Sequence, residues 1–146
     1  MNSKNNKYLS MVVRPYNKAE VKTLSFDDII NCISEGSHNK MWDKVRFFSG
    51  ARDIVIIFND TCKSDNLPLN RVFINNDGKL VDTLEGTFVI VKHDYGNESY
   101  ESLKPEQIDK LSEIFDDWTK PVNIMSFGQD PNYDLFELFI NKMYKN

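Results

Sequence analysis

The chain has few residues that could form disulfides, bind metals or anchor it in a membrane. It contains two cysteines, Cys32 and Cys62, and no C-x-x-C pair, which excludes a disulfide framework. No apolar run approaches the ~20 residues needed to span a bilayer. The lysines near the N-terminus are not followed by the apolar core of a signal peptide. We therefore expect a cytoplasmic protein with no membrane contact.

Histidines and catalytic motifs are equally scarce. His38 and His93 lie far apart in the sequence, and a metal site would need further ligands converging on one of them. The sequence has no P-loop, G-x-G-x-x-G, H-E-x-x-H or G-x-S-x-G motif. Adjacent carboxylates such as Asp116 and Asp117 would point about 100° apart on a helix, rather than toward one substrate. We predict no catalytic residue, no metal, no cofactor and no enzymatic activity.

The chain also lacks an excess of positive charge. Its formal net charge is −4 and its pI is about 5.2, so no electrostatic footprint for DNA is evident and direct nucleic-acid binding is not expected. What the chain does have is an ordinary globular composition, with 40% hydrophobic residues and ten phenylalanines. A length of 146 residues corresponds to a single domain.

The middle of the chain is rich in strand-forming residues. Two dense runs, Ile54–Phe58 and Thr87–Val91, enclose a polar loop, and Asn75–Gly78 has the Asp-Gly signature of a hairpin turn. Further strands are predicted at Tyr8–Arg14, Ala19–Leu24, Val45–Phe48, Arg71–Ile74 and Lys79–Asp82.

Three helices are predicted from capping residues and apolar periodicity. Ser25 caps the first, over residues 25–35, and Pro105 suits the first turn of the second, over 104–118. A third helix is predicted over 133–144, within a C-terminal extension covering 119–146; residues 1–6 are expected to be disordered. Together these elements predict a single α+β domain, a mostly antiparallel sheet of about five to seven strands with about three helices on one face.

Short motifs along the chain occur in a distinctive order. They are an MVVRP-type strand, a short helix, an acidic-polar strand, an LP-x-NR loop, a G-T-x-x-I-V strand and an S-L-x-x-E-Q-I helix. The corresponding segments are Met11–Pro15, Ser25–Ile33, Ile54–Asp60, Leu67–Arg71, Gly86–Val91 and Ser102–Ile108. Over residues 9–115 the chain resembles a family of small uncharacterised proteins from bacterial genomes, plasmids and phages. It departs from that pattern at 37–44 and after Trp118. The resemblance implies a mobile-element setting and no established reaction.

The best candidate for ligand or partner binding is the pair Asn70–Arg71. An arginine offers a planar fork for carboxylate or phosphate, asparagine supplies a donor and an acceptor, and Pro68 would stiffen the loop that presents them. Lys63 and Arg52 are candidate helpers. The structural alternative is that Asn70 satisfies backbone groups while Arg71 pairs with a surface acid.

A candidate interface lies toward the C-terminus. The helix predicted at 133–144 is apolar around most of its circumference, so it needs cover on more than one side. Burial against the sheet would supply this, as would a homodimer or a groove on a partner protein. The candidate interface residues are Trp118, Phe136, Phe139 and Tyr144.

The sequence is compatible with three functions. The first is a non-enzymatic phage or mobile-element accessory protein that binds a host protein, for example an inhibitor of CRISPR or restriction defence. The second is a small-ligand or nucleotide-binding protein that uses the Asn70–Arg71 loop. The third, an enzyme, requires at least two titratable groups converging in a cleft.

Overall fold

The computed structural model describes residues 6–48 and 51–124, except for the side chains of residues 47, 48, 51 and 52. The predicted terminal helix at 133–144 lies outside these residues, as does the predicted disordered end except for Asn6. The described elements, in chain order, are β1 (Lys7–Val13), β2 (Glu20–Ser25), α1 (Phe26–Ile33), β3 (Trp42–Phe48), β4 (Ala51–Asn59), β5 (Leu69–Ile74), β6 (Leu80–Glu85), β7 (Phe88–Asp94), β8 (Ser99–Glu101), α2 (Pro105–Phe115) and β9 (Val122–Asn123).

Two sheets make up the β structure. The larger has the strand order β2-β1-β7-β4-β3, and β8 pairs with β7 beyond the end of β1. Every pairing in this sheet is antiparallel. The smaller sheet has the order β6-β5-β9, and its short β5–β9 pairing is parallel. The prediction of a mostly antiparallel α+β domain is thus confirmed for the described residues.

Strand β7 lies at the centre of the larger sheet. It pairs with β1 along one edge and with β4 along the other. All four residues of Phe88–Val91 are buried, as are those of Ile54–Ile57 in the neighbouring strand. A strand covered on both faces needs apolar side chains at consecutive positions rather than at alternate ones. This is why both runs are dense in the sequence.

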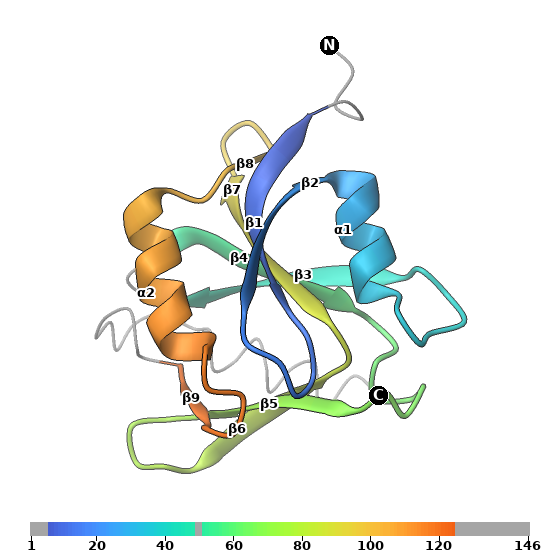
Figure 1. Cartoon of the computed structure of the whole chain (residues 1–146), viewed down its shortest axis with the longest axis vertical. Coiled ribbons are helices and arrows are strands. Elements are labelled where there is room, and N and C mark those ends of the chain that lie inside the picture. Colours follow the sequence, from blue (N-terminus) through green and yellow to red (C-terminus); the bar gives the residue numbers. More distant parts are fainter. Residues whose placement is uncertain (1–5, 49–50, 125–146) are drawn as a thin grey trace.

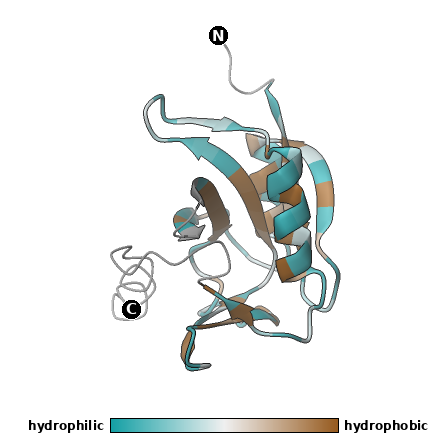
Figure 2. Cartoon of the chain, turned by 90° about the vertical axis from the view of Figure 1, so that its left-hand side faces the viewer, coloured by the Kyte–Doolittle hydropathy of each residue, from teal (hydrophilic) through white to brown (hydrophobic). Residues whose placement is uncertain are grey.

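The two described helices cover opposite faces of the larger sheet (Figure 1). Ile29 and Ile33 of α1 pack on one face, whereas Leu111 and Phe115 of α2 pack on the other together with the smaller sheet. Figure 2 shows the strands behind α2 as largely hydrophobic and much of the facing surface of α2 as hydrophilic. The prediction that the helices share one face is therefore wrong for these two, and the described residues contain two helices rather than about three.

The start of α1 follows its prediction closely. The Ser25 hydroxyl accepts a hydrogen bond from the Asp28 amide at 3.1 Å, and the Asp28 carboxylate accepts one from the Ser25 amide at 3.0 Å. This reciprocal pair satisfies two amides that the first turn leaves without helical partners.

None of the described helices is long and apolar enough to cross a membrane.

Candidate functional site

Asn70 and Arg71 are buried on strand β5 and do not form a solvent-facing loop. Their exposed fractions are 5% and 1%. The pairing of β5 with β6 shifts register between Leu69 and Arg71, and such an irregularity allows consecutive side chains to point inward. The Asn70 amide nitrogen donates to the carbonyl oxygens of Val13 at 2.8 Å and Gly86 at 2.7 Å. Of the two interpretations of Asn70, its contacts correspond to the structural one, in which it satisfies backbone groups.

The Arg71 guanidinium joins three segments that are distant in sequence. Its Nη2 donates to the carbonyl oxygens of Asn17 at 2.9 Å and Phe115 at 2.8 Å, and its Nη1 donates to the Asn70 side-chain oxygen at 2.7 Å. Burial lowers the pKa of Arg71, and the nearby Asp117 carboxylate partly opposes this. Instead of pairing with a surface acid, Arg71 holds the β1–β2 turn and the end of α2 against β5.

The proposed helper Lys63 lies against strand β6. Its ammonium group contacts the Glu85 carboxylate at 2.9 Å, the Thr83 carbonyl at 2.8 Å and the Asp82 carboxylate at 3.3 Å. Burial alone would lower the pKa of Lys63, but the bond to Glu85 and the charge of Asp82 raise it overall. These contacts hold Lys63 against β6. Its partners differ from those of Asn70 and Arg71, so it does not assist them. Arg52 lies in β4, and its side chain is outside the described residues.

A tight glycine contact explains how the LPLNR and GT segments meet. Gly86 has a φ of +74°, and a Cβ atom there would lie 2.7 Å from Cδ1 of Leu67. Its amide donates to the Pro68 carbonyl at 2.7 Å. Only glycine combines this backbone conformation with so close a neighbour. The segment is therefore shaped to close the interior around Asn70.

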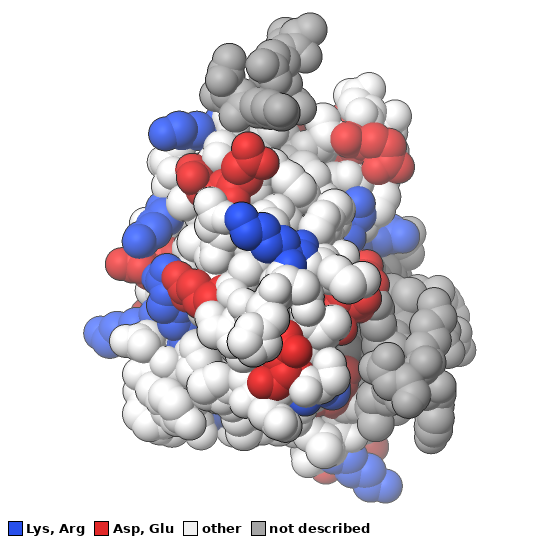
Figure 3. Space-filling model, turned by 90° about the vertical axis from the view of Figure 1, so that its right-hand side faces the viewer, with Lys and Arg blue, Asp and Glu red and all other residues white. Residues whose placement is uncertain are grey.

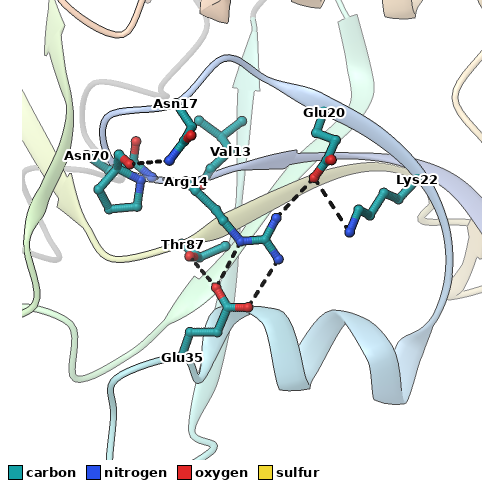
Figure 4. A network of polar contacts seen from close by, with 9 residues as sticks. Val13, Arg14, Asn17, Glu20, Lys22, Glu35, Asn70 and Thr87 are labelled. Carbon is teal, nitrogen blue, oxygen red and sulfur yellow. Dashed lines mark hydrogen bonds and ion pairs between the residues drawn. The ribbon is translucent and has the colours of Figure 1, made fainter.

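An ion-pair network closes the end of β1 (Figure 4). Arg14 binds both carboxylate oxygens of Glu35, with each distance 3.1 Å, and its third nitrogen donates to Glu20 at 3.1 Å. Thr87 also donates to Glu35 at 2.9 Å. This arrangement, bidentate at Glu35, links the residue after β1, the first residue of β2, the residue before β7 and the segment after α1. Lys22 also pairs with Glu20, at 3.6 Å, so two cations balance two carboxylates. We therefore assign the network a structural role.

Trp118 lies at the rim of a hollow of about 470 Å³ beside strand β5. Its ring makes an edge-to-face contact with Tyr16, with 5.5 Å between ring centroids. The two side chains are 43% and 61% exposed, and Leu69 is 47% exposed. We call Tyr16, Leu69, Trp118 and Pro121 the Tyr16–Trp118 surface. The other candidate interface residues, Phe136, Phe139 and Tyr144, lie outside the described residues.

Arg71 links the buried interior to this surface. The carbonyls that it binds belong to Asn17, one residue after Tyr16, and to Phe115, three residues before Trp118. Arg71 and Trp118, both predicted as site residues, therefore lie close together. Arg71 is buried beneath the Tyr16–Trp118 surface, and Trp118 is part of it. Tyr16 was missed in the sequence, although its position after Pro15 in a turn is a signal for exposure.

A second surface combines aromatic rings with cations on the side of the sheet that carries α1. Trp42, Lys44 and Arg46 alternate along β3, so they share one face. Tyr95 and Tyr100 reach this face from the β7–β8 turn and β8. The Lys44 ammonium lies 5.8, 6.0 and 5.7 Å from the ring centroids of Trp42, Tyr95 and Tyr100. We call these five residues the Lys44 surface.

His93 lies beneath the Lys44 surface, where it is 2% exposed. Its ring centroid is 4.2 Å from that of Tyr95 and 4.9 Å from that of Tyr100. Burial, followed by the charge of Lys44, lowers the pKa of His93 despite the opposing Glu98 carboxylate at 3.4 Å. His93 is therefore a neutral ring at pH 7 and supports the tyrosines above it.

Several titratable groups line a second hollow, of about 420 Å³, beside His93. Two of them form a cross-strand ion pair, Lys92 with Glu101 at 3.0 Å. Asp94 accepts a hydrogen bond from the Gly96 amide at 2.9 Å and so closes the β7–β8 turn. Within the part of the chain that the structure describes, no group of three His, Cys, Asp or Glu side chains is arranged to hold a metal ion.

Comparison with known protein families shows which family the chain belongs to. A family described as a domain of unknown function, DUF3846, matches residues 11–116, and the chain belongs to this family. The match confirms the resemblance to an uncharacterised family that the sequence motifs indicated. No curated protein and no solved structure matched the chain.

Proposed function

We propose that the protein is a non-enzymatic binding protein that attaches to a host protein through the Tyr16–Trp118 surface. The observation that supports this proposal most directly is the exposed edge-to-face pair of Tyr16 and Trp118 beside an apolar hollow. Tryptophan and tyrosine are enriched among residues that dominate the binding energy of protein interfaces, particularly when they lie beside a pocket.

The internal contacts of Arg71 support the same proposal. An exposed ring contributes most to binding when it is held in its bound position beforehand, because less side-chain freedom is lost on association. Arg71 fixes the backbone on both sides of the hollow, next to Tyr16 and close to Trp118. The surface is therefore preorganised from within.

The setting of this activity is a mobile element, and the partner belongs to the host. In its most concrete form, the protein inhibits a defence system of the CRISPR or restriction type by occupying a site on one of its proteins. This part of the proposal rests on the family resemblance in the sequence. A homodimer through the same surface is the version in which the partner is a second copy of the chain.

We do not propose a small-ligand site at Asn70–Arg71. Both side chains face inward, and the Asn70 amide nitrogen and both terminal nitrogens of Arg71 are bonded to groups within the protein.

A comparison of capture by two surface variants tests the proposal. Tagged wild-type protein is expected to retain a host protein at about equal stoichiometry from lysate, and Trp118→Ala is expected to lose it, since an anchor residue contributes about 2 kcal/mol or more. Leu80→Ala serves as the control, because Leu80 is a 63% exposed apolar residue on β6 that does not line the hollow.

A photo-reactive residue at position 16 would then report contact directly, through a cross-link to the captured protein. Native mass spectrometry separates a host partner from a second copy of the chain. Equal capture by wild type and Trp118→Ala, or no stoichiometric partner for the wild type, would contradict the proposal.

A further inference from the structure

The Lys44 ammonium has aromatic neighbours and no acidic partner. Three ring centroids lie within 6.0 Å of it, and within the described residues no carboxylate forms an ion pair with Lys44. The rings attract the cation through their negative faces. They do not neutralise it, so the positive charge stays available to an anion arriving from solvent.

Arg46 places a second cation on the same face of β3. Its guanidinium carbon lies 4.6 Å from the Tyr95 ring centroid, a geometry that holds the group against the ring. Residues 44 and 46 are two positions apart, which separates their backbones by about 7 Å along a strand. Lys44 and Arg46 therefore lie side by side on one face of β3, and Arg46 borders a hollow that Asp53, Asp94 and Glu101 also line.

Partly exposed rings flank these cations on both sides. Trp42 is 39% exposed and Tyr95 is 38% exposed. The position of each is fixed from within, Trp42 by Phe26 at 5.0 Å between ring centroids and Tyr95 by His93. A planar group can stack on such rings with a gain of about 1–3 kcal/mol per base.

The surrounding charge limits the size of the ligand. On the side of the molecule that carries α1, acidic and basic side chains are interspersed and neither sign forms a broad field (Figure 3). Glu98 lies beside His93, and Glu101 pairs with Lys92 nearby. A long polyanion would meet these carboxylates, whereas a single phosphate group needs only Lys44.

We propose that the Lys44 surface binds a nucleotide unit, with its phosphate at Lys44 and its base against Trp42 or Tyr95. The surrounding carboxylates favour a free mononucleotide, and a single-stranded nucleic acid, which presents the same phosphate and base, is distinguished from it by the test below. This site goes beyond the proposed protein contact, because it lies on other elements and takes another class of ligand. The net charge of −4, which argued against nucleic acid in the sequence, describes the whole chain and not this face.

The natural fluorescence of Trp42 gives a direct test. The chain has two tryptophans, so Trp118→Phe leaves Trp42 as the sole indole. In this background the protein is titrated with AMP and, separately, with oligo(dA) of about ten nucleotides. We expect saturable quenching, weakened about tenfold by Lys44→Gln, which removes a charge-assisted contact to phosphate. The control Lys79→Gln removes an equal charge from the distant β5–β6 turn and is expected to bind as before.

The outcomes separate the sources of the ligand. Equal affinity for AMP and for each unit of oligo(dA) supports a mononucleotide site. Tighter binding of oligo(dA), with log K falling against log salt at a slope of about −0.7 for each phosphate contact, supports single-stranded nucleic acid.

Three results would overturn the proposal. The first is no saturable quenching by either ligand, and the second is equal affinity of wild type and Lys44→Gln for the nucleotide, with an unchanged circular dichroism spectrum for the variant. The third is binding of poly-glutamate as strong as that of the nucleotide. The last result would identify the surface as a contact for an acidic protein. Since Trp118 is already replaced, none of these results depends on the Tyr16–Trp118 surface.

Discussion

The Arg71 guanidinium lies 2.8 Å from the carbonyl oxygen of Phe115, and this hydrogen bond joins β5 to the end of α2 across 44 positions of sequence. The same nitrogen binds the carbonyl of Asn17 at 2.9 Å. One buried side chain thus fastens the β1–β2 turn and the α2 end.

Arg71→Met is expected to lower the free energy of unfolding by about 3 kcal/mol, because it leaves buried carbonyl oxygens without donors. Urea unfolding monitored by circular dichroism measures this change. The control is Arg14→Met, at a side chain that is 30% exposed and whose lost ion pairs cost about 1 kcal/mol. Equal losses for the two variants would contradict the internal role of Arg71.

Replacement of Gly86 tests the close approach of Leu67. Gly86→Ala is expected to cost about 3 kcal/mol, from a positive φ and from a Cβ placed 2.7 Å from Cδ1 of Leu67. Gly78→Ala is the matched control, since Gly78 has a similar φ of +77° and nothing within 4 Å of the added Cβ. We expect about 1 kcal/mol there. The difference between the two unfolding free energies measures the contact itself, and a difference near zero would refute it.

Loss of the α1 cap tests the start of that helix. Ser25→Ala removes the acceptor for the Asp28 amide and is expected to destabilise the protein by about 1 kcal/mol. Ser25→Asp keeps an acceptor at the cap and is expected to recover most of the loss. The midpoint of thermal unfolding, compared among wild type and both variants, measures these changes. A Ser25→Ala variant as stable as wild type would show that the cap contributes nothing to stability.

Acidification is expected to destabilise the protein through His93. Its pKa in the folded protein lies below the ordinary 6.5, owing to burial and then to Lys44, with Arg46 in the same sense and Glu98 and Asp94 opposed. Between these two pKa values the unfolded chain binds more protons, so stability falls as the pH drops below about 6.5.

The check is urea unfolding at pH 7 and pH 5 for wild type and His93→Phe, which keeps a neutral ring against the tyrosines. The wild type is expected to lose about 1 kcal/mol more than the variant over this interval. Identical losses would mean that His93 does not titrate within it.

The sequence predicted local structure well where the determining contacts are local. Ser25 and Asp28 lie three residues apart, and the Asp77-Gly78 turn is set by its own backbone, with φ of +77° at Gly78. The predicted strands at Ile54–Phe58 and Thr87–Val91 correspond to β4 and β7, although β7 begins one residue later, at Phe88, because sustained apolar β-branched runs favour burial in a sheet.

The same sequence did not reveal which face each helix covers or where Asn70 and Arg71 point. Val55 and Ile56 are both fully buried, so apolar pattern does not distinguish the α1 face from the α2 face. The acceptors of Arg71 lie 54 and 44 positions away, at Asn17 and Phe115. Backbone carbonyls have no residue type, so composition and spacing cannot indicate them. Strand β8 was missed for a related reason, because its three residues lack any apolar alternation.

The placement of β7 has a consequence for where the chain tolerates substitution. Phe88–Val91 is enclosed on both faces and bonded along both edges, which makes it the segment least tolerant of change. The rings at Tyr16, Trp118 and Trp42 lie at the periphery, on turns and strand ends outside this enclosure. Substitution of those outer rings is therefore expected to leave the interior intact, whereas substitution within Phe88–Val91 would disturb both faces of the sheet.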